Sequence, residues 1–154
     1  MSKLSIGRCK LLSIAVIVAM LIVSAPAHIF AEPNQSAKAD PVQVYDMGAE
    51  KVTKIVPNNA EYQREALSWL QSATGLAVQL DLDEKCGYIY KVPLERTADV
   101  DIEGVKVQVN DVFLIHCPHK KPLLLVFSKK ERKPYLLVFK ADIKPFLELI
   151  HQAK

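Results

Sequence analysis

The sequence predicts an α+β fold, in which an antiparallel meander sheet of about six strands packs one face against an N-terminal and a C-terminal helix. Two segments repeat their apolar residues with the period of a helix, and the segments between them alternate with the period of a strand. The breaks between successive strands are short enough to be hairpin turns. Short breaks favour strands that pair with their neighbours in sequence, which gives a meander.

Residues 1–31 are predicted to be an export signal and not part of the fold. A basic start is followed by the apolar run 11–23 and then by small residues and Pro26. This order is typical of a signal peptide. Cleavage is expected after Ala31, with Ala27 as the alternative site. The other interpretation is an uncleaved membrane anchor, because the apolar stretch is about long enough to cross a bilayer.

The remainder of the chain is predicted to consist of a flexible leader, residues 32–41, and a single globular domain, residues 42–154. Without the three cations of the signal, 17 basic side chains (20 minus 3) face 17 acidic ones, so the exported chain is neutral. The basic isoelectric point therefore gives no reason to expect a nucleic-acid partner. Acids concentrate in residues 32–111 and bases in residues 112–154. Attraction between the two parts of one domain explains this distribution as well as a charged partner does.

A helix is predicted from Ala60 onward, with Asn58 and Glu61 as its cap and Gly75 as its stop. Its apolar residues fall on one helical face, which makes Trp69 a core anchor. That face consists of Tyr62, Ala66, Trp69, Leu70 and Ala73.

Alternating or continuous apolar runs predict the strands. They cover residues 52–56, 76–82, 88–94, 100–102, 105–109 and 112–115. Pro93 is expected at an edge or a bulge, because proline cannot donate a hydrogen bond to a sheet. Glu103-Gly104 is expected to form a tight hairpin turn, and Asn110-Asp111 another turn.

The segments Lys121–Phe127 and Lys133–Phe139 nearly repeat each other and predict a hairpin with a polar loop at 128–133. Their unbroken apolar runs fit central strands buried on both faces, or strands covered by a helix on one side. The basic loop also raises a membrane-surface role, which needs an apolar wedge beside the lysines. A final helix is expected around residues 143–150, capped by Asp142.

The helix and hairpin of residues 60–94 resemble the PepSY and related small exported inhibitor-like modules, in which a helix precedes two or three amphipathic strands. The chain lacks the usual Asp-Gly turn and closing aspartate of that pattern. The resemblance implies a binding or inhibitory module that acts outside the membrane.

One group of residues is suited to metal or redox chemistry. His116, Cys117 and His119 lie within four positions, and Cys86 is the other cysteine outside the signal. Nitrogen and sulfur ligands of this kind hold zinc or copper, although the spacing is not that of a known zinc motif. The alternatives are a Cys86–Cys117 disulfide, which an even cysteine count in an exported chain favours, and two free thiols.

Acidic side chains in two stretches of the chain form the second candidate. They are Asp81, Asp83 and Glu84 in the first group and Asp99, Asp101 and Glu103 in the second. Such carboxylates could hold calcium or act as a glycosidase pair. Solvent-facing positions of a sheet need the same alternation, and no calcium-loop, phosphate-loop or nucleophile motif accompanies it.

Together these observations predict a small exported, non-enzymatic binding protein at a Gram-positive cell surface or in the medium, with no cofactor. The acidic face of the sheet or the basic 129–133 loop would contact an unidentified protein or envelope component, and the N-terminal segment alone would meet the membrane. The alternative is an extracytoplasmic metal-binding or thiol-redox protein using Cys86, Cys117, His116 and His119.

Overall fold

The structure, a computed structural model, describes residues 39–78 and 86–153, which belong to one compact unit, Gln35–Lys154. The predicted signal and most of the predicted leader lie outside the described residues, as do Asp81, Asp83 and Glu84. The elements are β1 (Val42–Asp46), β2 (Lys51–Val56), α2 (Ala60–Gln71), β3 (Ala73–Leu76), β4 (Tyr88–Ile102), β5 (Val105–His116), β6 (Leu123–Phe127), β7 (Pro134–Phe139) and α3 (Lys144–Gln152). Neither described helix has the length and apolar character that a membrane crossing requires.

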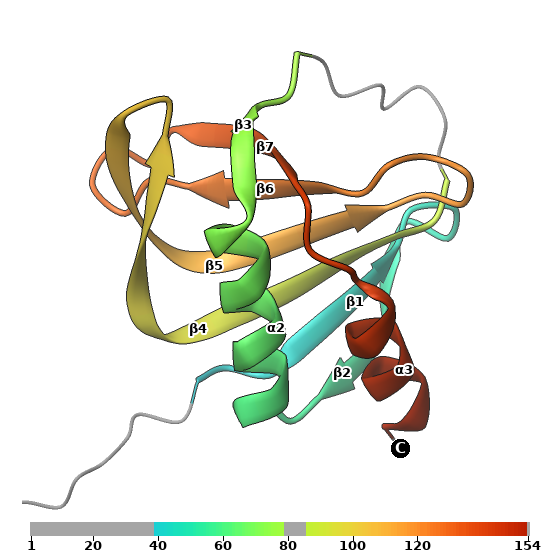
Figure 1. Ribbon diagram of the computed structural model, residues 1–154. Coiled ribbons are helices and arrows are strands. Elements are labelled where there is room, and N and C mark those ends of the chain that lie inside the picture. Colours follow the sequence, from blue (N-terminus) through green and yellow to red (C-terminus); the bar gives the residue numbers. More distant parts are fainter. Residues whose placement is uncertain (1–38, 79–85, 154) are drawn as a thin grey trace, which may run out of the picture. The chain divides into compact units, whose positions relative to one another are not determined.

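All seven strands form one antiparallel sheet in the order β2-β1-β4-β5-β6-β7-β3 (Figure 1). The α+β class and the meander from β4 to β7 are therefore confirmed. The sheet has seven strands where about six were expected: β1 was not predicted, and four of the shorter predicted strands merge into β4 and β5. The alternation of Val42 and Val44 with Gln43 and Tyr45 carries the signal of β1, since only the two valines are buried.

The long hairpin β4–β5 replaces four shorter predicted strands. β4 does not end near Pro93, because the register with β5 shifts between Pro93 and Ala98 and the strand continues past this bulge. The bulge predicted at Pro93 is confirmed. The turn predicted at Asn110-Asp111 is wrong, since both residues lie within β5. The turn at Glu103-Gly104 is confirmed, with positive φ angles of 53° and 84°.

Helix α2 ends earlier than the sequence suggests. Its last residue is Gln71, and Gly75 lies in β3 instead of stopping the helix. Ser72 ends the helix and accepts a hydrogen bond from the amide of Ala141 on its hydroxyl, at 3.0 Å. β3 then pairs with β7, so the segment after the helix does not form the hairpin with residues 88–94 that the resemblance implied.

The start of α2 also differs from the prediction. Asn59, not Asn58, caps the helix, and its side chain accepts hydrogen bonds from the amides of Glu61 and Tyr62. Asn58 is instead buried, and its amide donates to the carbonyl of Pro93 at 2.8 Å.

The side chain of Gln63 joins Asn58 at the bulge of β4. It donates to the same Pro93 carbonyl at 2.8 Å and accepts from the amide of Glu95 at 2.9 Å. Gln63 also donates to the side chain of Asn58 at 2.9 Å. The first turn of α2 therefore supplies the hydrogen bonds that the bulge removes from the sheet.

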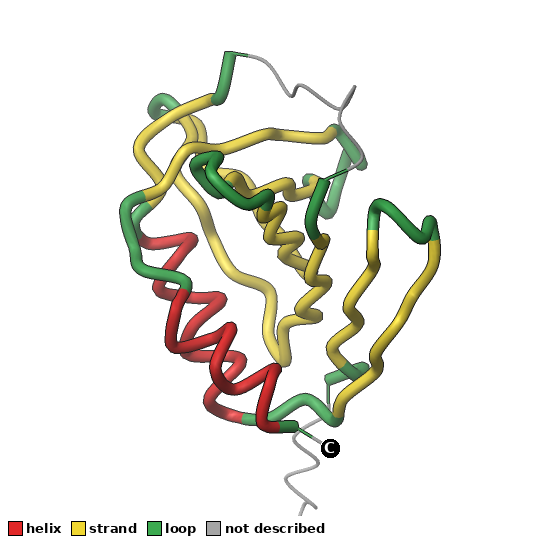
Figure 2. The backbone as a smooth tube through the Cα atoms, turned by 90° about the vertical axis from the view of Figure 1, so that its right-hand side faces the viewer, coloured by secondary structure: helices red, strands yellow, loops and turns green. Residues whose placement is uncertain are grey.

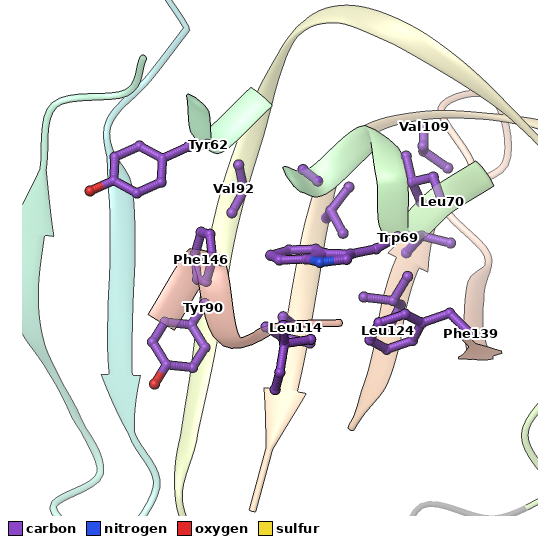
Figure 3. Packing of buried hydrophobic residues seen from close by; sticks show 14 of the residues in the cluster. Tyr62, Trp69, Leu70, Tyr90, Val92, Val109, Leu114, Leu124, Phe139 and Phe146 are labelled. Atoms are coloured by element: carbon purple, nitrogen blue, oxygen red, sulfur yellow. The ribbon is translucent and has the colours of Figure 1, made fainter. Parts of the chain in front are cut away.

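The core lies between the helices and one face of the sheet, which we call the inner face. Both helices lie in front of the sheet in Figure 1, and the turned view agrees (Figure 2). Trp69 of α2 and Phe146 of α3 are fully buried with ring centroids 4.8 Å apart, and Phe146 also packs edge-on against Tyr90 of β4 at 5.4 Å (Figure 3). Burial of such rings is the largest apolar contribution that the two helices make.

The repeated segments form the hairpin β6–β7, as predicted. Ser128 organises its turn, because its hydroxyl accepts from the amides of Glu131 and Lys133. Burial alternates along β6, where Leu124 and Val126 are buried and Phe127 is 41% exposed. Of the two interpretations, burial on both faces is wrong and cover on one side is correct.

Candidate functional site

The face of the sheet opposite the helices, which we call the outer face, is apolar across most of its width. Side chains point alternately to the two faces of a strand, so the residues between the buried ones point outward. Cross-strand pairing aligns them in two rows that run across the sheet. The first row is Val52, Tyr45, Ile89, Ile115 and Leu123. The second row is Ile55, Gln43, Lys91, Phe113, Leu125 and Leu136.

Several of these side chains are open to solvent. Val52 and Ile55 of β2 are 44% and 61% exposed, and Phe127 and Val138 on the far strands are 41% and 36% exposed. One-sided antiparallel sheets usually carry polar residues on the face that meets water. An apolar outer face therefore marks a contact surface more than a solvated one.

The half of the outer face between β2 and β5 contains a shallow depression of about 320 Å³. It is lined by Gln43, Tyr45, Val52, Ile89, Lys91 and Phe113. The Lys91 ammonium lies 3.3 Å from a carboxylate oxygen of Asp111 and 5.9 Å from the centre of the Phe113 ring. Both contacts compensate its charge.

Basic side chains gather where β6 turns into β7. Lys129, Lys130, Arg132 and Lys133 share this turn with a single acid, Glu131. Arg132 lines a second depression of about 180 Å³ together with Phe127 and Asp111. The Lys129 ammonium donates to the hydroxyl of Thr97 at 3.0 Å, which holds it toward the β4–β5 hairpin, and Lys133 lies over the ring of Tyr135 on β7.

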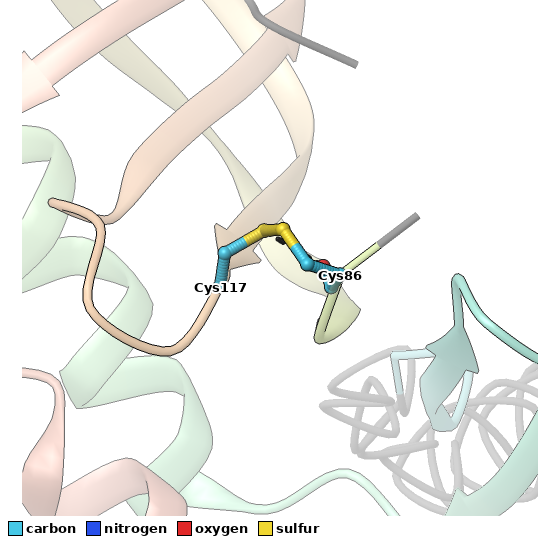
Figure 4. Close-up of a disulfide and its surroundings, with 2 residues drawn as sticks. All are labelled: Cys86 and Cys117. Atoms are coloured by element: carbon cyan, nitrogen blue, oxygen red, sulfur yellow. Dashed lines mark hydrogen bonds between the residues drawn. A yellow bond between two sulfur atoms is a disulfide. The ribbon is translucent and has the colours of Figure 1, made fainter. Parts of the chain in front are cut away.

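The predicted disulfide between Cys86 and Cys117 is present (Figure 4). It joins the residues just before β4 and just after β5, whose Cα atoms are 5.3 Å apart. Gly87 beside it has a φ of 75°, and a Cβ atom there would collide with the carbonyl of His116. The close approach of the two chain segments therefore requires glycine.

The oxidised structure does not bring the four predicted metal ligands together. Both sulfurs are consumed by the disulfide, and the residues that the structure describes include no cluster of three or more His, Cys, Asp or Glu side chains suited to a metal. His119 is exposed in a turn with a positive φ of 67°. Nδ1 of His116 is buried without a hydrogen-bond partner, and burial lowers the pKa of this histidine. The metal hypothesis remains a prediction for the reduced chain alone.

The described acidic candidates lie on the far half of the β4–β5 hairpin. Asp99, Asp101 and Glu103 are all exposed. Asp101 accepts a hydrogen bond from the amide of Gly104 at 2.8 Å, so it supports the hairpin turn. Asp99 and Asp101 alternate with the buried Val100 and Ile102, so these two acids share one face of β4 as predicted, and a contact role for them stays a prediction.

Sequence reasoning missed the outer face, although the apolar runs of β6 and β7 were its signal. The two described helices cover one side of the seven-stranded sheet, so no described helix packs against residues such as Leu125 and Val138. Comparison with protein-family models, with curated proteins and with solved structures finds no match for this chain.

Proposed function

We propose that this chain is a small exported, non-enzymatic interaction protein of the cell envelope or medium, and that it binds through the outer face of its sheet. The observation that carries the proposal is the set of exposed apolar side chains on β2, β6 and β7, together with the depression between β2 and β5. Among the described residues that line this depression, Lys91 alone is charged, and it pairs with Asp111. Apolar contact area with few polar groups suits adhesion to a partner better than acid–base or nucleophilic chemistry.

The disulfide supports the exported location, because such bonds persist in oxidising compartments. The N-terminal sequence pattern supports the same location independently.

The proposal is tested by placing a photocrosslinking residue at position 138 of the chain and expressing it in an exporting host. We expect adducts from Val138 on the outer face and none from the matched control position Leu67, which is equally exposed at 37% on helix α2. Equal adduct yields at both positions, or none at either, would contradict binding through this face.

The metal or thiol-redox alternative is favoured by one observation, the unpartnered Nδ1 of His116 next to the disulfide. Zinc titration of the reduced chain tests it. Stoichiometric binding that is lost on both Cys117→Ser and His116→Gln would establish this alternative, whereas weak binding that neither change alters would remove it.

A further inference from the structure

We propose that the outer face docks on the surface of a lipid membrane with anionic headgroups. This inference rests on the proposed function, since it names the partner of the same surface. Peripheral membrane binding requires exposed apolar side chains to enter the interface and cations beside them to meet the headgroups. The outer face offers both.

The apolar part is concentrated on the strands β6 and β7. Phe127 and Val138 are the exposed side chains there, and the half-buried Leu125 and Leu136 lie directly opposite each other on these strands. Phe127 packs edge-on against Phe113 of β5, with ring centroids 5.7 Å apart. The contact with Phe113 holds the Phe127 ring in a fixed position at the surface, where its other side stays exposed.

The cationic part lies at both ends of β6. Lys121 is exposed two positions before this strand, and Arg132 lies beside Phe127 in the depression at the other end. Lys130 in the same turn is also exposed. The apolar strand is therefore bordered by positive charge at each end.

The charges around the apolar surface indicate which kind of partner fits it. Residues 112–154 contain nine basic and three acidic side chains, and Asp111, which lines the depression beside Arg132 and Phe127, is paired with Lys91. In a symmetric contact centred on β6, a second copy of the chain would bring the cations at the two ends of this strand against each other. An anionic lipid surface satisfies the cations and the apolar residues together.

The experiment is co-sedimentation of the chain recovered from an exporting host with two kinds of vesicle. One kind contains phosphatidylcholine alone, and the other contains phosphatidylcholine mixed with anionic phosphatidylglycerol. We expect stronger binding to the anionic vesicles, weakened by salt. The double change Phe127→Ser with Val138→Ser should lower binding to them about tenfold, since two exposed apolar side chains leave the interface.

A second variant separates charge from apolar contact. Arg132→Gln should weaken binding to anionic vesicles about fivefold and leave binding to neutral vesicles unchanged. The matched control is Leu67→Ser, which removes an equally exposed apolar side chain from α2 and should change nothing. Because all variants carry the same N-terminal segment, its contribution cancels in the comparison. Circular dichroism of each variant confirms that it is folded.

Three results would overturn the inference. Unchanged vesicle binding by the folded double variant is the first. The second is equal binding of soluble polyphosphate and anionic vesicles, which would show that charge alone suffices. The third is a dimer in sedimentation velocity that the double change dissociates, without vesicle binding, which would make a second copy the occupant. In the third case protein adducts at position 138 would still uphold the proposed function, whereas an absence of adducts would remove both.

Discussion

The two faces of the sheet carry similar residues in different surroundings. On the inner face, Leu124, Val126 and Leu137 are fully buried beneath the helices. On the outer face, Leu125, Phe127 and Val138 of the same two strands remain partly or largely open. The contrast teaches that an apolar strand is not by itself a core strand, because burial depends on whether another layer covers it.

The largest expected effect comes from the inner face. Phe146→Ala should lower the free energy of unfolding by about 3–5 kcal/mol, because a fully buried ring that touches Tyr62, Trp69 and Tyr90 leaves a cavity. Urea denaturation measures the change. Phe127→Ala on the outer face is the matched control, with an expected loss of about 1 kcal/mol or less. Equal losses would mean that the outer face is as well packed as the inner one.

Removal of the disulfide tests whether the packing of the helices on the sheet keeps the chain folded without a covalent link. Cys86→Ser with Cys117→Ser should cost about 3–4 kcal/mol, since the bond joins residues 31 positions apart and restricts the unfolded chain. Thermal unfolding with and without a reducing agent gives the comparison. The serine variant should be insensitive to the reductant, and a remaining sensitivity would contradict this assignment.

The pH dependence of the free energy of unfolding tests whether the phenol of Tyr90 is buried beneath the helices. Burial, with a smaller contribution from the Tyr88 charge, raises the pKa of Tyr90 to about 12. The neutral phenol is thus favoured in the folded state. Below pH 10 the phenol is neutral in both the folded and the unfolded chain, so the free energy of unfolding is not yet lowered. Between pH 10 and 12 the unfolded chain loses this proton and the folded chain keeps it, so the free energy of unfolding should fall by about 2 kcal/mol. Tyr90→Phe should remove this part of the alkaline decline, as measured by urea denaturation across that range.

The smallest effect concerns the polar contact between α2 and the bulge of β4. Gln63→Leu should destabilise the fold by about 1–2 kcal/mol, because the carbonyl of Pro93 and the amide of Glu95 each lose a buried partner. Arg64→Leu, at an exposed neighbouring position, serves as the control. A double change with Asn58→Ala should cost less than the sum of the two single changes, since both side chains bond the same carbonyl. Additive losses would show that the two act independently.

The sequence by itself determined the class, the hairpin β6–β7 and both helices, whereas the pairing of Cys86 with Cys117 was one of three alternatives that the structure decided. Each of the features that the sequence determined depends on local pattern: the helical spacing around Trp69 and Phe146, and the polar loop that begins at Ser128.

Only the tertiary structure decided the rest. The bulge at Pro93 is a local signal, but its rescue by Asn58 and Gln63 joins residues thirty or more positions apart. β3 pairs with β7 across the chain, and no local period encodes that choice. The outer face emerged for the same reason: alternation shows which side chains share a face, whereas the number and placement of the helices decide which face is covered.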